Sequence, residues 1–315
     1  MKNKPYDIIV FGGICCDIIM SGIKEMPKPG EEVWAENMKM TVGGVFNVAA
    51  AASRLNLNTG LPCVLGEDAL SSFIRKTAQD EMINTSLFLN TKGNYEQLSL
   101  VLNFGQERSF VSYVADHKKL ELKQHMEKIV ESQEMKVAVF SMSGEEWNTR
   151  MMKKLRDKGV TVVLDCSWDE EVLTSEVLLR QIQNCDYFLP NLKEARTITR
   201  QQDYEKVAMK LTEYAPHVIV KLGADGAVYA DSRKLVHYPA IDLGKVIDTT
   251  GAGDNFMAGF CYGLVNGGEV ERCIEFGQLC GSKSVIAVGG FTASLYESEL
   301  QDISQVHIYG ERKNA

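Results

Sequence analysis

The sequence predicts an α/β protein in which helices cover both faces of a mostly parallel sheet, with a small β-sheet lid attached to this three-layer body. Two observations favour this fold class. From about residue 135 onward, short apolar runs alternate with helical periodicity, and strands begin at intervals of roughly 25 to 30 residues. Two earlier stretches, 14–42 and 95–114, break that rhythm and look like antiparallel excursions.

The N-terminal segment predicts a buried first strand. Lys2 and Lys4 precede the apolar stretch Ile8 to Cys16, an arrangement that also occurs in signal peptides. The stretch is too short to span a bilayer, and Gly12-Gly13 interrupts it. We therefore expect a strand in a protein without a membrane segment.

The second excursion predicts a hairpin. Leu98, Leu100, Leu102 and Phe104 alternate with Gln97, Ser99, Val101 and Asn103, which is the period of a strand with one apolar face. Gly105 marks a turn at Asn103 to Glu107 that leads back into Phe110 to Tyr113. The expected domains are a body of residues 1–13, 43–94 and 115–315 and a discontinuous lid of residues 14–42 and 95–114.

The second half of the chain predicts βαβ units joined by right-handed crossovers. Trp147, Met151 and Leu155 form one face of a helix, and Gly159 follows at the expected helix end. The expected strands are 137–140, 160–164, 187–189 and 218–222, and a further helix carries Tyr204, Val207, Ala208 and Leu211 on one side.

Composition and motif searches exclude several function classes. The 34 basic and 42 acidic residues give a net charge of −8, which disfavours a nucleic-acid partner because phosphate backbones require basic surfaces. The eight cysteines form no C-x-x-C pair, which is typical of reduced thiols in a cytoplasmic protein. The P-loop, dinucleotide-binding, zincin and nucleophile-elbow motifs are all missing from the sequence.

The most informative motif is the segment 248–260. A helix is expected to begin near Gly253, and the preceding Gly-Ala-Gly turn leaves backbone N–H groups at its positive end, where anions bind. Asp254 places a proton acceptor beside that site, a combination that phosphoryl transfer to a hydroxyl requires. The alternative is an ordinary loop with a helix-capping aspartate.

Segment 248–260 resembles the C-terminal signature of the ribokinase-like (PfkB-type) carbohydrate kinase family. Other motifs resemble the same family in order and spacing over about residues 5 to 295. They are the strand and aspartate at 11–17, the lid entry turn at 27–31, the N-terminal signature at 41–49, the N-x-x-E motif at 191–195 and the nucleotide-site turn at 221–226.

The resemblance implies a ribokinase-like fold and a set of site residues. Catalysis would involve Asp254 as general base, with Gly251, Ala252 and Gly253 forming the anion hole. The substrate would meet Asp17, Gly43, Gly44, Asn47 and Arg108. ATP would meet Asn191, Glu194, Lys221, Gly223, Asp225 and Gly226, with Mg²⁺ linked to Glu194 through water. Potassium would bind at Asp248 and Thr250.

The resemblance therefore implies an ATP-dependent sugar kinase, and two rivals stay open. One is a nucleoside kinase of the same fold, whose base would be covered by Trp34, Met38, Met40 and the apolar face of Leu98 to Phe104. The other is a sugar-binding regulator that has lost catalysis. Residues Ser141 to Ser143 contain no acid of the kind that some ribose kinases use, which argues against ribose. An exposed lid face would need a cover, so a homodimer through the lid is a further expectation.

Overall fold

The computed structural model describes residues 4–95, 97–104 and 107–314. Among these residues, eight strands form a central sheet in the order β14-β13-β12-β11-β10-β9-β1-β4. Neighbours from β4 to β12 pair in parallel, and β13 and β14 continue the sheet in antiparallel fashion. The strand bounds are β1 Tyr6–Phe11, β4 Thr59–Gly60, β9 Met135–Ser141, β10 Thr161–Asp165, β11 Tyr187–Leu189, β12 His217–Lys221, β13 Ala227–Ala230 and β14 Leu235–Tyr238.

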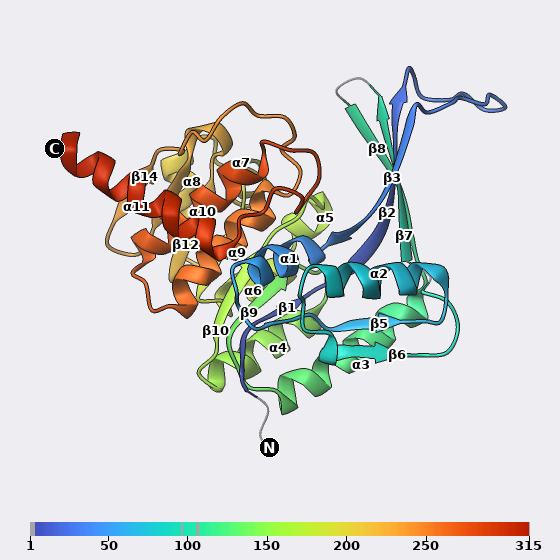
Figure 1. Cartoon of the computed structure of the whole chain (residues 1–315). Coiled ribbons are helices and arrows are strands. Elements are labelled where there is room, and N and C mark those ends of the chain that lie inside the picture. The colour runs from blue at the N-terminus through green and yellow to red at the C-terminus, as the bar shows by residue number, and fades with distance from the viewer. Residues whose placement is uncertain (1–3, 96, 105–106, 315) are drawn as a thin grey trace.

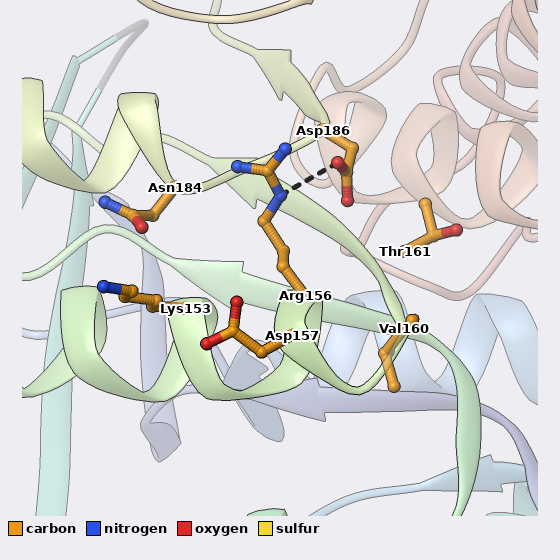
Figure 2. Close-up of a pocket in the computed structure, with 8 residues that line it drawn as sticks. Lys153, Arg156, Asp157, Val160, Thr161, Asn184 and Asp186 are labelled. Carbon is orange, nitrogen blue, oxygen red and sulfur yellow. Dashed lines mark hydrogen bonds and ion pairs between the residues drawn. The ribbon is translucent and has the colours of Figure 1, made fainter.

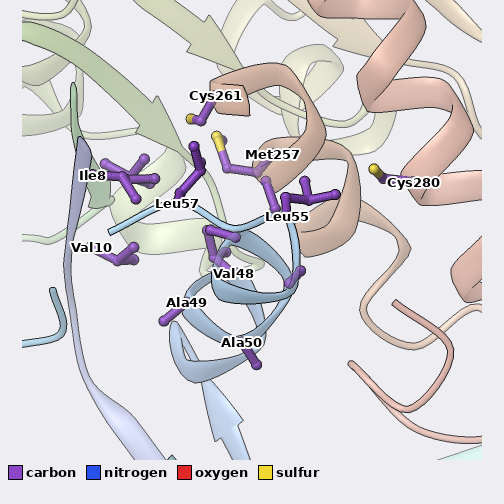
Figure 3. Close-up of a cluster of buried hydrophobic side chains, with 14 of the residues drawn as sticks. Ile8, Val10, Val48, Ala49, Ala50, Leu55, Leu57, Met257, Cys261 and Cys280 are labelled. Atoms are coloured by element: carbon purple, nitrogen blue, oxygen red, sulfur yellow. The ribbon is translucent and has the colours of Figure 1, made fainter. Parts of the chain in front are cut away.

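Helices cover both faces of this sheet because its strands send alternate side chains to opposite sides. On β1, Ile8 and Val10 enter one apolar cluster, while Ile9 and Phe11 enter another. The first cluster is closed by α1 Phe46–Arg54, α2 Ala69–Asp80, α9 Ala252–Val265 and α10 Val270–Ser284. Figure 3 shows the part of this cluster where β1, α1, α9 and α10 meet. The second is closed by α3 Asp116–Ser132, α4 Glu146–Asp157, α6 Glu176–Gln183 and α8 Tyr204–Leu211.

The remaining helices and strands are short or peripheral. The helices are α5 Glu170–Leu173, α7 Leu192–Thr199 and α11 Glu297–Asn314. Two short strands, β5 Cys63–Leu65 and β6 Phe88–Asn90, pair with each other beside the main sheet. Within the described ranges, no helix combines the length and the apolar character that crossing a membrane requires.

A separate four-stranded sheet stands away from the body (Figure 1). Its strands are β2 Ile14–Ile23, β3 Asn37–Gly44, β7 Gln97–Phe104 and β8 Glu107–Val114, in the order β3-β2-β7-β8. β2 and β7 pair in parallel, which joins the two excursions predicted from the sequence. The predicted fold class is confirmed, and we call this sheet the lid.

The strand register gives the lid two different faces. Asp17 lies opposite Thr41 and Ser99, so these residues share one face, which we call the inner face. The next residue, Ile18, lies opposite Met40 and Leu100 on the outer face. The outer face is apolar and also carries Met20, Met38, Leu98, Leu102, Val111 and Tyr113.

This register bears on the rival nucleoside kinase. In that alternative Trp34, Met38, Met40 and the apolar face of Leu98 to Phe104 would cover the base, and these β3 and β7 residues do not share the face of Asp17. They point to the other side of the lid, because neighbouring residues in a strand alternate between faces. Trp34 lies in the loop between β2 and β3, and 81% of its surface is exposed.

Candidate active site

The anion-binding turn lies at the start of α9. Gly251 has a φ of 76°, in the left-handed region, and a Cβ atom there would lie 2.1 Å from the carbonyl oxygen of Gly290. Within the described part of the chain, no side chain caps this helix. Among the described residues, the N–H groups of Gly253 and Asp254 donate to no protein acceptor, whereas that of Ala252 donates to the Thr249 carbonyl at 3.3 Å. Free N–H groups at a helix N-terminus form a site for an anion.

Asp254 lies in the first turn of α9 and is held by a residue from a distant helix. Nδ2 of Asn47, in α1, donates a hydrogen bond to Oδ2 of Asp254 at 2.9 Å. Burial and the neighbouring charge of Asp165 raise the pKa of Asp254 to about 7. A carboxylate with this pKa is suited to act as a general base near neutral pH.

A half-buried ion pair faces this turn from the sheet. Lys221 ends β12 and Asp165 ends β10, and their Nζ and Oδ1 atoms are 3.0 Å apart. A Cβ atom on Gly253 would lie 3.3 Å from Nζ of Lys221, so the ammonium group sits against the first turn of α9. Burial opposes the charge of Lys221, but nearby Asp165 and Glu194 outweigh it and raise the pKa of Lys221.

Sequence reasoning missed Asp165. The available signal was an acid directly after the predicted strand 160–164, at the sheet edge where α/β proteins bind their ligands. The acid was overlooked because the motif resemblance did not include it.

Glu194 and Asn191 form a reciprocal cap at the start of α7. The Asn191 side chain accepts from the Glu194 N–H at 2.9 Å, and the Glu194 carboxylate accepts from the Asn191 N–H at 2.8 Å. Glu194 is buried, and this burial raises its pKa. The N–H of Lys221 donates to the Pro190 carbonyl at 2.9 Å, which brings the N-x-x-E motif beside the ion pair.

Asp17 and the Gly-Gly turn meet at the base of the lid. A Cβ atom on Gly43 would lie 2.2 Å from Oδ2 of Asp17, so the carboxylate packs directly against the Gly43 backbone. Burial raises the pKa of Asp17. Gly44 lies against the carbonyl of Gly13, in the short connection between β1 and β2. The side chain of Arg108 lies outside the part of the chain that the structure describes.

Asp248 and Thr250 are connected just before the anion-binding turn. The N–H and the hydroxyl of Thr250 donate to Oδ1 of Asp248 at 3.0 and 2.6 Å. Oδ2 of Asp248 accepts from the N–H of Gly289 at 3.1 Å. This pair and the loop that follows α10 are therefore held together.

The turn residues Gly223, Asp225 and Gly226 lie between β12 and β13, at the same sheet edge as Lys221. Gly223 and Asp225 are exposed. No hydrogen bond within the described ranges joins this turn to Asp254 or Asp165. Gly223 and Asp225 are thus on the surface beside Lys221, whereas Gly226 is buried against the backbone of Tyr238.

A surface pocket of about 540 Å³ lies elsewhere, at the amino ends of β10 and β11. It contains the Arg156–Asp186 ion pair, whose Nε and Oδ1 atoms are 3.0 Å apart, with Lys153 and Asp157 nearby (Figure 2). Asp165 and Asn191 lie at the opposite ends of the same strands. This pocket is therefore separate from the carboxyl-edge cluster.

The family model described as "pfkB family carbohydrate kinase" matches residues 7–295. The chain belongs to this family. It is an ATP-dependent carbohydrate kinase, as the resemblance implied. Among curated proteins, the kinase is 26% identical over 299 residues to a 5-dehydro-2-deoxygluconokinase of Geobacillus thermodenitrificans, with 89% of this chain and 88% of that protein covered. It is 28% identical over 294 residues to a ribokinase of Lactococcus lactis, covering 90% and 91% of the two chains.

Solved structures support the fold. The structure of Arabidopsis thaliana ribokinase complexed with ribose and ATP superposes with a TM-score of 0.80 and 22% identity, covering 95% of this kinase and 98% of that chain. A nucleoside kinase of Methanocaldococcus jannaschii superposes with a TM-score of 0.78 and 22% identity over the same shares of the two chains. Sugar and nucleoside kinases therefore share this architecture, and the fold alone does not select the acceptor.

Proposed function

We propose that this kinase transfers the γ-phosphate of ATP to a primary hydroxyl of a carbohydrate, with Asp254 as the general base. The observation that supports this most directly is the position of Asp254. Its carboxylate, with a pKa of about 7, lies in the first turn of α9 beside free N–H groups and the ammonium of Lys221. A base and an anion site thus lie within one helical turn.

The proposed step follows from these positions. Asp254 accepts the proton of the sugar hydroxyl while the oxygen forms a bond to the γ-phosphorus, and the bond from that phosphorus to the bridging oxygen of ADP breaks. The N–H groups of the 251–253 turn, with Lys221, stabilise the negative charge on the transferred group. Asn47 orients Asp254, and Asp17 with the Gly43-Gly44 turn binds sugar hydroxyls.

The carboxylates at this edge also fit the expected metal ions. Glu194 offers hard oxygen donors, and within the described residues no three acidic or other ligating side chains converge on one point. Magnesium commonly binds through one or two carboxylates, water and substrate phosphates, so we expect it to arrive with ATP and to neutralise phosphate charge near Glu194. The linked oxygens of Asp248 and Thr250 fit a K⁺ ion. Asn191 and the 223–226 turn would border the bound nucleotide.

A nucleoside kinase of the same fold stays the alternative. Met38, Met40 and the leucines of β7 lie on the outer lid face, so a base bound on the inner face would instead meet Ile19, Val101 and Phe110.

The eight cysteines are free thiols, which agrees with our proposal that the kinase works in the cytoplasm.

The test of the proposal is the Asp254→Asn variant, assayed by ADP release with a panel of sugars and nucleosides. Loss of a general base typically lowers kcat by about 10²–10⁴-fold, and the fold should persist because asparagine has nearly the same shape. Asp157→Asn, at the opposite sheet edge, is the matched control and should keep full activity. Full activity of Asp254→Asn, or transfer to nucleosides alone, would contradict the proposal.

A further inference from the structure

The residue after the proposed base is a buried asparagine whose amide joins two loops. Asn255 lies near the start of α9, and its exposed fraction is 0%. Its Nδ2 group donates to the carbonyls of Gly251 and Gly290, both at 2.8 Å. Its Oδ1 atom accepts a hydrogen bond from the hydroxyl of Ser294. The amide therefore connects the start of α9 to the loop that follows α10.

The Gly251 carbonyl belongs to the anion-binding turn. It accepts from the backbone N–H of Asn255 at 2.9 Å as well as from the side chain, so one residue holds this carbonyl twice. The carbonyl of Gly251 and the N–H of Ala252 belong to one planar peptide unit. Holding the carbonyl therefore also fixes the direction of an N–H group in the proposed anion hole.

The Gly290 carbonyl belongs to a loop that packs against two parts of the proposed site. A Cβ atom on Gly251 would lie 2.1 Å from the Gly290 carbonyl oxygen, so the loop touches the anion-binding turn. A Cβ atom on Gly290 would lie 2.6 Å from Oδ1 of Asn47, the residue that donates to Asp254. A shift of Gly290 would thus disturb the anion-binding turn on one side and the holder of the proposed base on the other.

The same loop has a second anchor further along the chain. Nη1 of Arg54, at the end of α1, donates to the carbonyls of Thr292 and Ser294 at 3.3 and 3.2 Å. These bonds do not depend on the Asn255 amide. Loss of that amide should therefore leave the loop attached to the body and free only the segment around Gly290.

A buried asparagine can be purely structural, since nearly all buried amides are hydrogen-bonded. Asn255 differs because its bonds end on the anion-binding turn and on the neighbour of Asn47. We propose that Asn255 is a positioning residue for phosphoryl transfer: by joining Gly290 to Gly251, it fixes the anion-binding N–H groups relative to the carboxylate of Asp254. This inference rests on the proposed function and adds to it a residue that acts through the backbone.

The experiment measures Asn255→Ser with whichever panel compound the wild-type kinase phosphorylates fastest. A serine hydroxyl in a helix can donate to the carbonyl four residues before it, so this variant keeps a bond to Gly251 and loses the bond to Gly290. We expect kcat to fall by about 10–100-fold, since a misplacement of about 1 Å can cost 10²-fold. The KM values for ATP and for the acceptor should change little, because the lost contacts orient groups that act in the transition state.

Tyr262→Phe is the matched control. Tyr262 lies on the same helix, is buried and also makes two hydrogen bonds to another segment. Its hydroxyl donates to Glu297 at 2.9 Å and accepts from Gln301 at 2.6 Å, both in α11. It lies about two helical turns beyond Asp254. Both variants should have a lower Tm than the wild type, and only Asn255→Ser should have a lower kcat.

Hydrogen exchange followed by mass spectrometry measures the positioning without turnover. In Asn255→Ser, peptides that cover residues 248–254 and 286–294 should exchange faster than in the wild type, whereas peptides of the lid should not change. If Asn255→Ser fails to fold, Ser294→Ala provides the test. It removes the hydroxyl that orients the amide, and kcat should fall by about 2–10-fold, the equivalent of one neutral hydrogen bond.

An unchanged kcat in Asn255→Ser, or in Ser294→Ala where that variant decides, would overturn the inference. A loss of kcat that Tyr262→Phe shares would also overturn it, because the effect would then follow stability alone. The proposed function fails separately: a wild-type kinase that transfers only to nucleosides would contradict it, while a lower kcat of Asn255→Ser on that acceptor would still support the positioning role.

Discussion

Three carboxylates share one ammonium at the carboxyl edge of the sheet: Asp165, Glu194 and Asp254 lie around Lys221. The charge of Asp165 raises the pKa of Asp254, whereas Lys221 lowers it. The two members of this ion pair therefore act in opposite directions on the proposed base. The charge of each residue can be removed by substituting a neutral side chain of similar shape.

This opposition predicts opposite pH profiles. Asp165→Asn removes a negative charge, so the pKa of Asp254 falls, the base stays ionised at lower pH, and the acidic limb of kcat/KM moves below its wild-type position near pH 7. Lys221→Met removes a positive charge and should move the same limb to higher pH. Profiles of kcat/KM from pH 5 to 9 measure the shift of the acidic limb in each variant. If the acidic limb moved in the same direction in Asp165→Asn and Lys221→Met, the assignment of Asp254 as the base would be contradicted.

At the scale of elements, the start of α9 depends on a close contact between two loops. Gly251→Ala would place a methyl group 2.1 Å from the Gly290 carbonyl and force a left-handed conformation on alanine. The conformation alone costs about 1–2 kcal/mol, and the overlap adds to it. We expect a lower Tm and a large loss of kcat.

Gly159→Ala is the matched control for this prediction. Gly159 also has a left-handed φ, of 79°, but a Cβ atom there would meet no atom within 4 Å. The Gly159→Ala variant should therefore lose only the stability that the left-handed conformation costs, about 1–2 kcal/mol, and its kcat should not change. If thermal unfolding showed equal losses of stability in the two variants, the overlap with the Gly290 carbonyl would add nothing to the destabilisation of Gly251→Ala.

Much of the fold could be predicted because the spacing of apolar residues along the chain indicates which face of a helix or strand is buried. Strand 187–189 was predicted with the bounds of β11, and the motif at 248–260 predicted the start of α9 within about two residues, the usual uncertainty of a helix end. The antiparallel strands β13 and β14 were not predicted, since each has only four residues, too few for the spacing of apolar side chains to distinguish a strand from a loop.

The site was less accessible to sequence reasoning. Alternation identified β7 as a strand, but only pairing with β2 shows that its leucines face away from Asp17. The contacts of Asp254 with Asn47 and of Lys221 with Asp165 join residues far apart in the chain, and no local pattern predicts such pairs. The roles assigned to these residues stay predictions until the variants are assayed.

At the scale of the whole molecule, no other segment of the described residues covers the outer lid face. Val111 and Tyr113 on β8 are 61% and 63% exposed, and Met38 and Met40 are exposed on β3 at the other edge of the sheet, with side chains of β2 and β7 between the two pairs. A contiguous apolar patch of this kind is typical of an interaction surface. We propose that a second copy of the kinase covers it, which would give a homodimer joined through the lids.

Light scattering coupled to size exclusion tests this proposal. The wild-type kinase should run as a dimer, and Val111→Asp should produce monomers because it places a charge in the apolar contact. Met209→Asp is the control, since Met209 is also exposed but lies on α8 of the body. A monomeric wild-type protein would remove the proposal.

The parallel pairing of β2 with β7 also has a consequence for how the chain acquires its structure during synthesis. The two strands are separated by α1, α2 and the β5–β6 pair, so the lid cannot assemble until residues beyond 114 have left the ribosome. Residues 248–254, which complete the opposite wall of the site, emerge much later. The nascent chain therefore passes through a period in which Asp17 and its neighbours on the lid are in place while the turn that would receive the phosphate has yet to be made.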